Sequence, residues 1–359
     1  MKKPLESLRE EMRKKDRDIV RLLNERSEIS MKIGRVKGQA GFSVYDPAQE
    51  AKVIRYLREL NGGPLSDSQV TSIFREILSA SRDLQRPTRV AYLGPEASFS
   101  HQASLLHFGS SCQFFPQQDI ARVFDEVEKG EVEWGVVPVE NSLEGSVNVT
   151  LDRLVLTPLA LQAEIDLRIS QCLISPSKII KGIKNVYSHP QGLAQCQAWL
   201  RANLPNVVTG EMESTAAAAR LVRGKKASAA IGSAMAAEVY GLNILAHGIE
   251  DNPSNTTRFL VIGRGEGEPT GNDKTSIIFS TPDSPGALYR ALASFSRRKI
   301  NLAKIESHPA KDRKWEYLFF VDFAGHIRDR AIQACIRELK DKTIYLKILG
   351  SYPRAKDVL

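Results

Sequence analysis

The sequence predicts a multidomain protein in which an all-α segment is followed by an α/β segment and then by a ferredoxin-like α+β segment. A chain of 359 residues with 42% hydrophobic residues is too long for one ordinary core, so two or three domains are expected. The N-terminal segment has helical periodicity, and the later segments alternate short apolar runs with helical stretches. We expect domains at residues 1–86, 88–265 and 274–352.

The first helix is predicted from a run of apolar residues spaced three and four apart. The GQAG stretch at 38–41 ends it, and Asp46-Pro47 with Gln49 provides the start of a second helix that runs to about Leu60. Ser66 or Asp67 can cap a third helix. The apolar residues of the first helix are Leu5, Leu8, Met12, Ile19, Leu22, Ile29, Ile33 and Val36.

Three helices, one of them about 45 Å long, cannot bury this stripe among themselves. We therefore expect a partner chain to complete the helical bundle, in a homodimer or a dimer of dimers.

After Pro87 the pattern of apolar residues becomes that of alternating strands and helices, which is typical of an α/β segment. Strands are predicted at RVAYLG, EWGVVPVE, KNVYSHP and SAAIGS, with helices at 191–202 and 214–223. The polar cluster at 263–274 is typical of a linker. Beyond it, strands at 275–280, 301–307, 315–323 and 343–349 enclose helices at 286–299 and 329–339, which is the βαββαβ order of a ferredoxin-like module.

Composition excludes several function classes. No apolar run approaches the roughly 18 residues of a membrane helix, and no apolar stretch follows the basic N-terminus, so a cytoplasmic protein is expected. The four cysteines form no C-x-x-C pair and the six histidines no H-E-x-x-H, which disfavours a metal site. The net charge is +8, but the basic residues are interleaved with 42 acidic ones, which favours a small anion over nucleic acid as the binding partner. Phosphate-binding glycine loops are absent, so no cofactor is expected.

Polar residues interrupt the helical stripe of the first segment. Arg26 lies on the seam, where its guanidinium needs an anion, either a ligand or a carboxylate on a neighbouring helix. Lys37 has almost the same angular position about 16 Å further along the axis, so the two could hold a small dianion. Arg9 lies about 25 Å before Arg26 and could reach such a site only from another subunit. Ser81 and Gln85 continue the stripe of the third helix, unless they form a frayed polar end.

This pattern resembles the all-helical (AroQ-type) chorismate mutases over residues 1–86. The resemblance implies an intertwined dimer that brings Arg9 to the partner's site. Arg9 and Arg26 would hold two carboxylates, Lys37 and Gln85 would donate to the ether oxygen, and Glu50 would accept from the ring hydroxyl. Gln49 stands where the family usually has arginine. The matching residues are Arg9, Arg26, Lys37, Asp46, Glu50, Ser81 and Gln85, of which Asp46 either binds substrate or only caps its helix.

In the middle segment, strands lead into small polar residues that open helices, an arrangement suited to binding carboxylates. The motifs GPEASFS, VVPVENSLEG, SHPQGLAQC, ESTAAAA and NTTRF together resemble the prephenate dehydratases over residues 88–265. The resemblance implies two α/β lobes, like those of periplasmic binding proteins, with prephenate between them. The functional positions it implies are Glu140, Asn141, Ser188, Gln195, Thr257 and Arg258.

For the dehydratase chemistry we expect Thr257 to donate a hydrogen bond to the leaving hydroxyl and Arg258 to anchor a carboxylate. Glu140 is the alternative proton source if burial raises its affinity for a proton. For His189, a structural role in its turn is favoured over acid catalysis.

The last segment resembles an ACT domain of the kind attached to these dehydratases. PGAL at 285–288 and IESHP at 305–309 match its two effector-binding motifs, which implies phenylalanine as effector. The implied effector-binding residues are Gly286, Ala287, Leu288, Glu306, Ser307 and His308, where His308 replaces the usual arginine. Histidine loses its charge near neutral pH, so His308 either contacts the effector carboxylate with a pH-dependent strength or serves only in packing.

Three functions fit these observations. The leading one is a bifunctional enzyme that converts chorismate to prephenate and then to phenylpyruvate, with feedback inhibition by phenylalanine. The second is a small-molecule sensor without turnover, which the complete polar sets of both sites disfavour. The third is an enzyme whose mutase activity has been lost through Gln49, leaving only the dehydratase.

Overall fold

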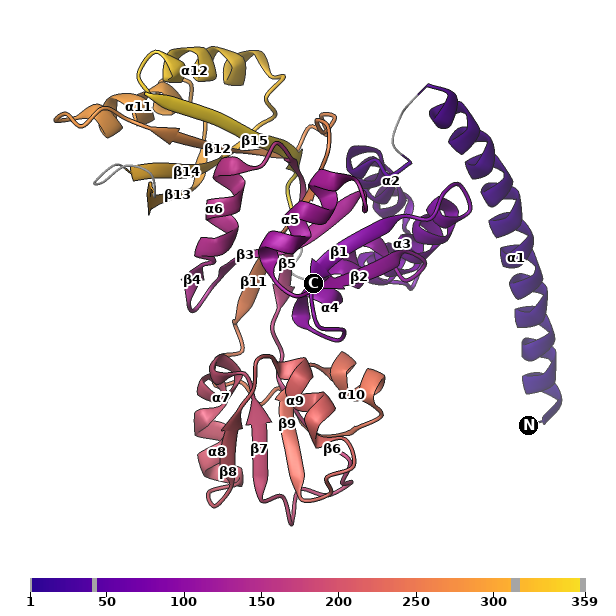
Figure 1. Ribbon diagram of the computed structural model, residues 1–359. Helices are drawn as coiled ribbons and strands as arrows, with labels where there is room; N and C mark the ends of the chain where they lie inside the picture. The colour runs from indigo at the N-terminus through magenta and orange to yellow at the C-terminus, as the bar shows by residue number, and fades with distance from the viewer. Residues whose placement is uncertain (1, 41–43, 311–316, 356–359) are drawn as a thin grey trace. The chain divides into compact units, whose positions relative to one another are not determined.

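The computed structural model describes residues 2–40, 44–310 and 317–355, and its backbone divides into two compact units (Figure 1). The helical unit comprises the described residues of Met1–Asp46, Glu50–Thr88 and Phe108–Gln113. The α/β unit comprises those of Pro47–Gln49, Arg89–His107 and Phe114–Leu359. In the described ranges, no helix has the length and apolar character needed to cross a membrane.

The helical unit contains the predicted elements. Helix α1 runs unbroken over Lys2–Gln39, α2 over Pro47–Leu60 and α3 over Asp67–Asp83. Of the two capping residues considered for α3, Ser66 is the N-cap, and it forms a capping box in which Gln69 N–H donates to the Ser66 hydroxyl. The all-α prediction for this segment is confirmed.

The predicted apolar stripe of α1 lies on the surface of the single chain. Its side chains are between 50% exposed, at Leu5, and 66% exposed, at Val36. Helices α2 and α3 of the same chain therefore leave this stripe uncovered. An uncovered apolar face of this length is a strong driving force for association.

The first lobe of the α/β unit is a mixed sheet with strand order β2-β1-β3-β11-β5. Strand β1 runs parallel to β3, whereas β11 runs antiparallel to both of its neighbours, β3 and β5. The strands are β1 (Arg89–Leu93), β2 (Gln113–Gln117), β3 (Trp134–Asn141), β5 (Ala160–Arg168) and β11 (Thr256–Gly263), with the short β4 (Gly145–Ser146) beside β3. The helices are α4 (Phe99–Phe108), α5 (Ile120–Lys129) and α6 (Asn148–Leu156).

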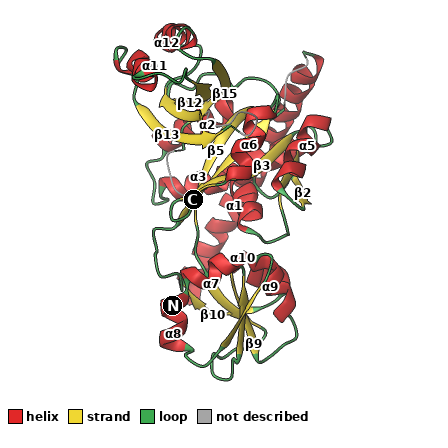
Figure 2. Ribbon diagram, turned by 60° about the vertical axis from the view of Figure 1, so that its left-hand side comes forward, coloured by secondary structure: helices red, strands yellow, loops and turns green. Residues whose placement is uncertain are grey.

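The second lobe is a sheet with strand order β10-β6-β9-β7-β8 and helices on both faces (Figure 2). Helices α7 and α8 cover the face that presents Leu173 and Ile231, and α9 and α10 cover the face that presents Ile174 and Ala230. The helix predicted at 191–202 is divided at Cys196 into α7 and α8. The elements are β6 (Cys172–Ser175), β7 (Asn185–Ser188), α7 (Pro190–Gln195), α8 (Gln197–Asn203), β8 (Val208–Glu211), α9 (Thr215–Val222), β9 (Ser228–Gly232), α10 (Ala234–Tyr240) and β10 (Asn243–His247).

The chain passes between the lobes after β5 and again after β10. Hydrogen bonds hold the two connecting segments together, from Ile169 N–H to the Asn255 carbonyl at 2.8 Å and from Ile249 N–H to the Gln171 carbonyl at 3.0 Å. The two-lobed α/β prediction is confirmed, and both connections lie beside one another at the junction of the lobes.

The C-terminal module has the predicted βαββαβ order and an antiparallel sheet of order β13-β14-β12-β15. The strand predicted at 315–323 begins with Trp315 and Glu316, which lie outside the described residues. The elements are β12 (Asp273–Ser280), α11 (Ala287–Ser296), β13 (Leu302–Pro309), β14 (Tyr317–Ala324), α12 (Arg330–Lys340) and β15 (Tyr345–Pro353). The ferredoxin-like prediction is confirmed.

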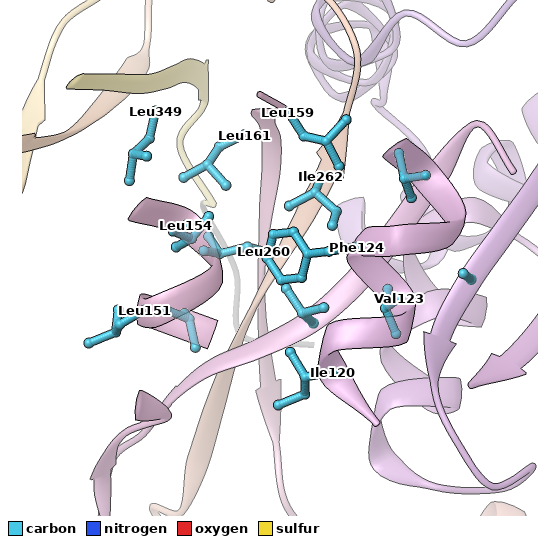
Figure 3. Close-up of a cluster of buried hydrophobic side chains, with 14 of the residues drawn as sticks. Ile120, Val123, Phe124, Leu151, Leu154, Leu159, Leu161, Leu260, Ile262 and Leu349 are labelled. Atoms are coloured by element: carbon cyan, nitrogen blue, oxygen red, sulfur yellow. The ribbon is translucent and has the colours of Figure 1, made fainter. Parts of the chain in front are cut away.

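The two faces of this C-terminal sheet pack against different partners. Ile277 and Val321 face α11 and α12 in one core. Their strand neighbours Ile278 and Phe320 point to the opposite face and belong to the core of the first lobe. Figure 3 shows Leu349 of β15 in that cluster together with side chains of α5, α6 and β11. The first lobe and the C-terminal module therefore share one hydrophobic core.

Candidate active sites

In the helical unit, α1 and α3 bring three of the predicted residues together. Arg26 Nη1 donates to Ser81 Oγ at 2.7 Å, and Gln85 Nε2 donates to Ser30 Oγ at 2.6 Å. Helices approach this closely because α1 has glycine at position 34, where a Cβ atom would lie 2.6 Å from Gln85 Cγ. Gln85 Oε1 is buried without a hydrogen-bond partner among the described residues. The polar end of α3 is therefore a packed cluster and not a frayed terminus.

A second group of polar residues lies around Glu50, at the start of α2. Burial raises the pKa of the Glu50 carboxyl, and the charges of Arg82 and Lys37 oppose that effect. Arg82, which is 3% exposed, donates to Glu50 and to the carbonyl of Phe108. Lys37 Nζ donates to the Val44 carbonyl at 3.1 Å. Sequence reasoning missed Arg82, because its place on the inner face of α3 looked like a break in the apolar pattern.

The remaining mutase candidates lie at the two ends of this arrangement. Asp46 immediately precedes α2, and its carbonyl accepts the Glu50 N–H at 3.0 Å, as at a helix start. Arg9 is exposed on α1 and makes no hydrogen bond or ion pair with any residue that the structure describes. Within a single chain, Arg9 is thus not joined to the cluster of Arg26, Ser81 and Gln85.

The α/β unit contains a cavity of about 840 Å³, lined by residues of both lobes and of the segments that connect them. Helix starts surround it, as predicted, including those of α7 and α9 with their capping residues His189 and Ser214. His189 Nδ1 accepts the N–H of Gln191 at 3.3 Å, which is the structural role expected for it. A cavity of this size accommodates a small organic acid.

Asn141 and Thr257 form the polar centre of the cavity wall. Asn141 Oδ1 accepts the N–H groups of Leu143 and Glu144, at 3.0 and 3.3 Å, and this fixes the orientation of the side-chain amide. Its Nδ2 consequently points to Thr257 and donates to Oγ1 at 2.9 Å. With that oxygen used as an acceptor, the hydroxyl proton of Thr257 remains available to a molecule in the cavity.

The hydrogen-bond chain continues from Asn141 into the second lobe. Asn141 Nδ2 also donates to Asn255 Oδ1 at 2.8 Å, and Asn255 Nδ2 donates to Gln195 Oε1 at 3.0 Å. Gln195 Nε2 and Gln171 Oε1 are buried without partners among the described residues, and both side chains line the cavity. Buried orphan polar atoms are costly, so a donor and an acceptor placed here point to a polar ligand.

The cation that faces this cavity is Arg220 of α9, and among the described lining residues it is the one arginine or lysine. Arg220 lies in α9 directly after the ESTAAAA motif, whose small alanines are buried. Sequence reasoning missed it because an exposed arginine on a short helix carries no signal by itself. Gln171, in the connecting segment, was missed because a single glutamine outside any motif carries no signal by itself.

Three predicted dehydratase residues lie outside the cavity lining, and their expected roles are corrected here. The predicted substrate anchor Arg258 lies outside the cavity lining, and its guanidinium is bound by Glu164, Asp322 and Tyr352, at 2.9, 2.6 and 3.0 Å. Glu140 forms an ion pair with Lys304 at 2.8 Å. Ser188 is fully buried and donates to the Ile231 carbonyl at 2.9 Å. Asn141, Gln195 and Thr257 are the predicted residues that the cavity brings together.

The predicted effector residues are distributed over two faces of the C-terminal module. Gly286 is exposed at the start of α11 with a φ of 77°, whereas Ala287 is buried and Leu288 packs on the helix core. On β13 the side chain of Ser307 is exposed. Glu306 lies on the opposite face of the strand, where its carboxylate is 2.9 Å from Lys304 Nζ.

His308 lies on the same face as Glu306, against the first lobe of the α/β unit. It is 6% exposed, its Nε2 lies 2.9 Å from Asp152 Oδ1, and its ring meets Phe320 edge-on. Of the two roles considered for His308, this geometry favours packing over direct contact with an effector.

Comparisons with known proteins match all three segments. Sequence profiles match over residues 8–86 (chorismate mutase type II), 90–267 (prephenate dehydratase) and 275–341 (ACT domain). The chain is 45% identical to the bifunctional chorismate mutase/prephenate dehydratase of Aquifex aeolicus, over 98% of both chains, and 44% identical to that of Stutzerimonas stutzeri, again over 98% of both. It also resembles the crystal structure of a prephenate dehydratase from Arthrobacter aurescens in complex with L-Phe, with a TM-score of 0.69 and 33% identity over 74% of this chain and 90% of that one.

Proposed function

This chain belongs to the bifunctional chorismate mutase/prephenate dehydratases, and from that premise we propose which residues carry each reaction and how the product controls it. The helical unit rearranges chorismate to prephenate, and the α/β unit converts prephenate to phenylpyruvate, carbon dioxide and water. One observation supports the choice of dehydratase residues above all. It is the hydrogen bond of fixed direction from Asn141 to Thr257 in the cavity wall.

For the mutase reaction, Arg26 binds one substrate carboxylate and Arg9 of a second subunit binds the other. A pericyclic rearrangement needs a folded substrate and stabilisation of the charge that grows on the ether oxygen, but no nucleophile. Lys37 and Gln85 donate to that oxygen. Gln85 bonds to Ser30, whose hydroxyl also donates to the Ser81 carbonyl at 3.4 Å. Glu50, held by Arg82, accepts from the ring hydroxyl, and Asp46 and Ser81 shape the site.

The mutase site is completed by a second copy of the chain. The exposed stripe of α1 supplies the apolar face for such a dimer. Arg9 lies on this same helix, about 25 Å from Arg26 along its axis, so it can reach only another subunit's ligand. Dimers formed through α1 can pair further into a dimer of dimers.

For the dehydratase reaction, Thr257 donates a hydrogen bond to the C4 hydroxyl of prephenate as the C–O bond breaks. The electron pair of the departing carboxylate's C–C bond enters the ring, carbon dioxide leaves, and the hydroxyl takes up a proton from solvent and leaves as water. Asn141 holds Thr257, and Gln195 binds the substrate with its unpaired Nε2. Arg220 pairs with a substrate carboxylate at the cavity edge.

The C-terminal module binds phenylalanine and thereby inhibits the dehydratase. The relative from Arthrobacter aurescens was crystallised with L-Phe, and this chain has the motifs PGAL and IESHP. The exposed Gly286 and Ser307 contribute to the effector site, whereas His308 connects the module to Asp152 of the first lobe and Glu306 pairs with Lys304 within the module. Because the module and the catalytic cavity are separate, inhibition requires two states with different affinity for phenylalanine.

One experiment tests these proposals together. Purified protein is incubated with chorismate, without added metal or nucleotide, and prephenate and phenylpyruvate are assayed separately with and without phenylalanine. We expect both products, and stronger inhibition of phenylpyruvate formation than of prephenate formation. Turnover that is insensitive to phenylalanine would contradict the effector assignment and leave the enzymatic one standing.

A further inference from the structure

Strands β3 and β11 carry two pairs of residues that point in opposite directions. Asn141 is the register partner of Thr257, and Glu140 is the register partner of Arg258. Successive side chains of a strand point to opposite faces of a sheet. Asn141 and Thr257 therefore line the cavity, whereas Glu140 and Arg258 point away from it.

The C-terminal module places a matching pair opposite Glu140 and Arg258. Lys304 on β13 and Asp322 on β14 are register partners in their own sheet. Lys304 Nζ lies 2.8 Å from Glu140 Oε2, and Arg258 Nη1 lies 2.6 Å from Asp322 Oδ2. The four charged side chains therefore alternate in sign where the strand pair β3–β11 meets the strand pair β13–β14. Their side chains are 10% to 35% exposed, so water screens these ion pairs only in part.

Further contacts hold this arrangement in one geometry. Ser276 Oγ donates to Asp322 Oδ1 at 2.5 Å, and the Tyr352 hydroxyl accepts from Arg258 at 3.0 Å. On the first lobe, Glu164 accepts from Arg258 at 3.0 Å. The hydrophobic core that the first lobe shares with the module lies beside these charges and contains Tyr352 itself. Two ion pairs between the same neighbouring strands, backed by a shared core, fix strand position as well as side-chain direction.

We propose that Lys304 and Asp322 of the C-terminal module are positioning residues of the dehydratase reaction. Lys304 holds Glu140 and Asp322 holds Arg258, and these two set the places of their strand neighbours Asn141 and Thr257. The module is in this way a part of the catalytic scaffold, in addition to any effector that it binds. The dehydratase lobe would keep its cavity without these ion pairs, but the Thr257 hydroxyl would no longer be held in its position relative to the substrate.

The consequence for the reaction is a loss of rate at nearly constant substrate affinity. Misplacement of a reacting group by about 1 Å can cost on the order of 10²-fold in rate. Substrate affinity depends on groups such as Arg220 and Gln195, which neither Lys304 nor Asp322 touches. Mutase turnover by the same chain serves as an internal measure of the amount of folded protein.

The test uses the full chain with Lys304→Met and with Asp322→Asn. We expect each change to lower the kcat for prephenate by about tenfold or more, with KM and mutase turnover close to those of the unchanged protein. Arg328→Gln is the matched control, because it removes an ion pair of the same module, with Glu268 at 2.6 Å, that is exposed and distant in sequence from both strands. This control should leave the dehydratase kcat unchanged.

A charge exchange separates positioning from general damage to the module. Glu306 also lies 2.9 Å from Lys304, so the exchange is made in a Glu306→Gln background. There Lys304→Glu and Glu140→Lys each place like charges together, and the double variant restores opposite charges in reversed order. We expect each single variant to lose kcat and the double variant to regain a large part of it. The proposal is overturned by a normal kcat in Lys304→Met and Asp322→Asn, by an equal loss in Arg328→Gln, or by a double variant no better than its singles.

Discussion

Asn141 Nδ2 donates a hydrogen bond of 2.9 Å to Thr257 Oγ1 across the antiparallel strands β3 and β11. The bond has one direction, because Asn141 Oδ1 is occupied by the N–H groups of Leu143 and Glu144. Thr257 therefore accepts from Asn141 and keeps its own proton for the cavity. An alcohol is a weak acid, but a positioned hydroxyl donor stabilises a leaving oxygen without transferring its proton first.

Replacing Thr257 with valine keeps the shape of the side chain and removes the donor. We expect the kcat for prephenate to fall by about 10² or more, the cost of losing one positioned transition-state donor. Thr257→Ser should retain most of the rate. The measurement is steady-state dehydration of prephenate, with mutase turnover recorded on the same samples.

The matched control for that change is Thr256→Val on the same strand. Thr256 has a hydroxyl that bonds weakly to the Ser254 carbonyl, at 3.4 Å, and it does not line the cavity. Its variant should keep the dehydratase rate. Equal losses in the two valine variants would indicate damage to β11 and not the removal of a donor.

Arg220 should act on substrate binding more than on the chemical step. Arg220→Met removes the charge that faces the cavity, and we expect KM for prephenate to rise about tenfold, since a hydrogen bond to a charged group contributes roughly 1.5–3 kcal/mol. Arg223→Met, on the exposed end of the same helix, is the control and should leave KM unchanged. A fall in kcat with constant KM would remove Arg220 from the role of anchor.

The mutase site should be shared between subunits. Arg9→Ala and Arg26→Ala chains are each expected to be inactive as mutases, because each lacks one carboxylate contact in every site. Mixed and refolded, they should form heterodimers in which one of the two sites is intact, so some activity should return. Each variant refolded alone is the control. Dimeric mixtures without any gain in mutase activity would rule out a site shared in this way.

Gln85 should make mutase activity insensitive to pH through neutrality, because an amide donates at every accessible pH. A glutamate at this position donates only when protonated, and an ordinary glutamate carboxyl has a pKa near 4.3. The activity of Gln85→Glu should therefore decrease as pH rises through the pKa of the new carboxyl. The measurement is the pH–rate profile of both proteins. A wild-type profile that already falls as pH rises above about 5 would count against Gln85 as the donor.

The sequence by itself determined the fold class of each segment, and it suggested some of the polar residues that line the cavity. Helix α1 follows from its apolar spacing and α3 from a cap at Ser66 or Asp67, because these signals are local. The βαββαβ order of the last module follows from alternating apolar runs. Thr257 and Asn141 were named in advance because the motifs VVPVENSLEG and NTTRF resemble those of the prephenate dehydratases.

The tertiary structure alone decided which way those motif residues face and what they meet. Alternation along a strand predicts that Arg258 and Thr257 point to opposite faces, but it does not say which face is covered by another module. Arg258 therefore looked like a substrate anchor, whereas Asp322, 64 residues further on, already holds it. Arg82 and Arg220 were missed for the converse reason. Arg82 pairs with the partly buried Glu50 and Arg220 faces the cavity, and only the packing of distant segments brings these surroundings to each arginine.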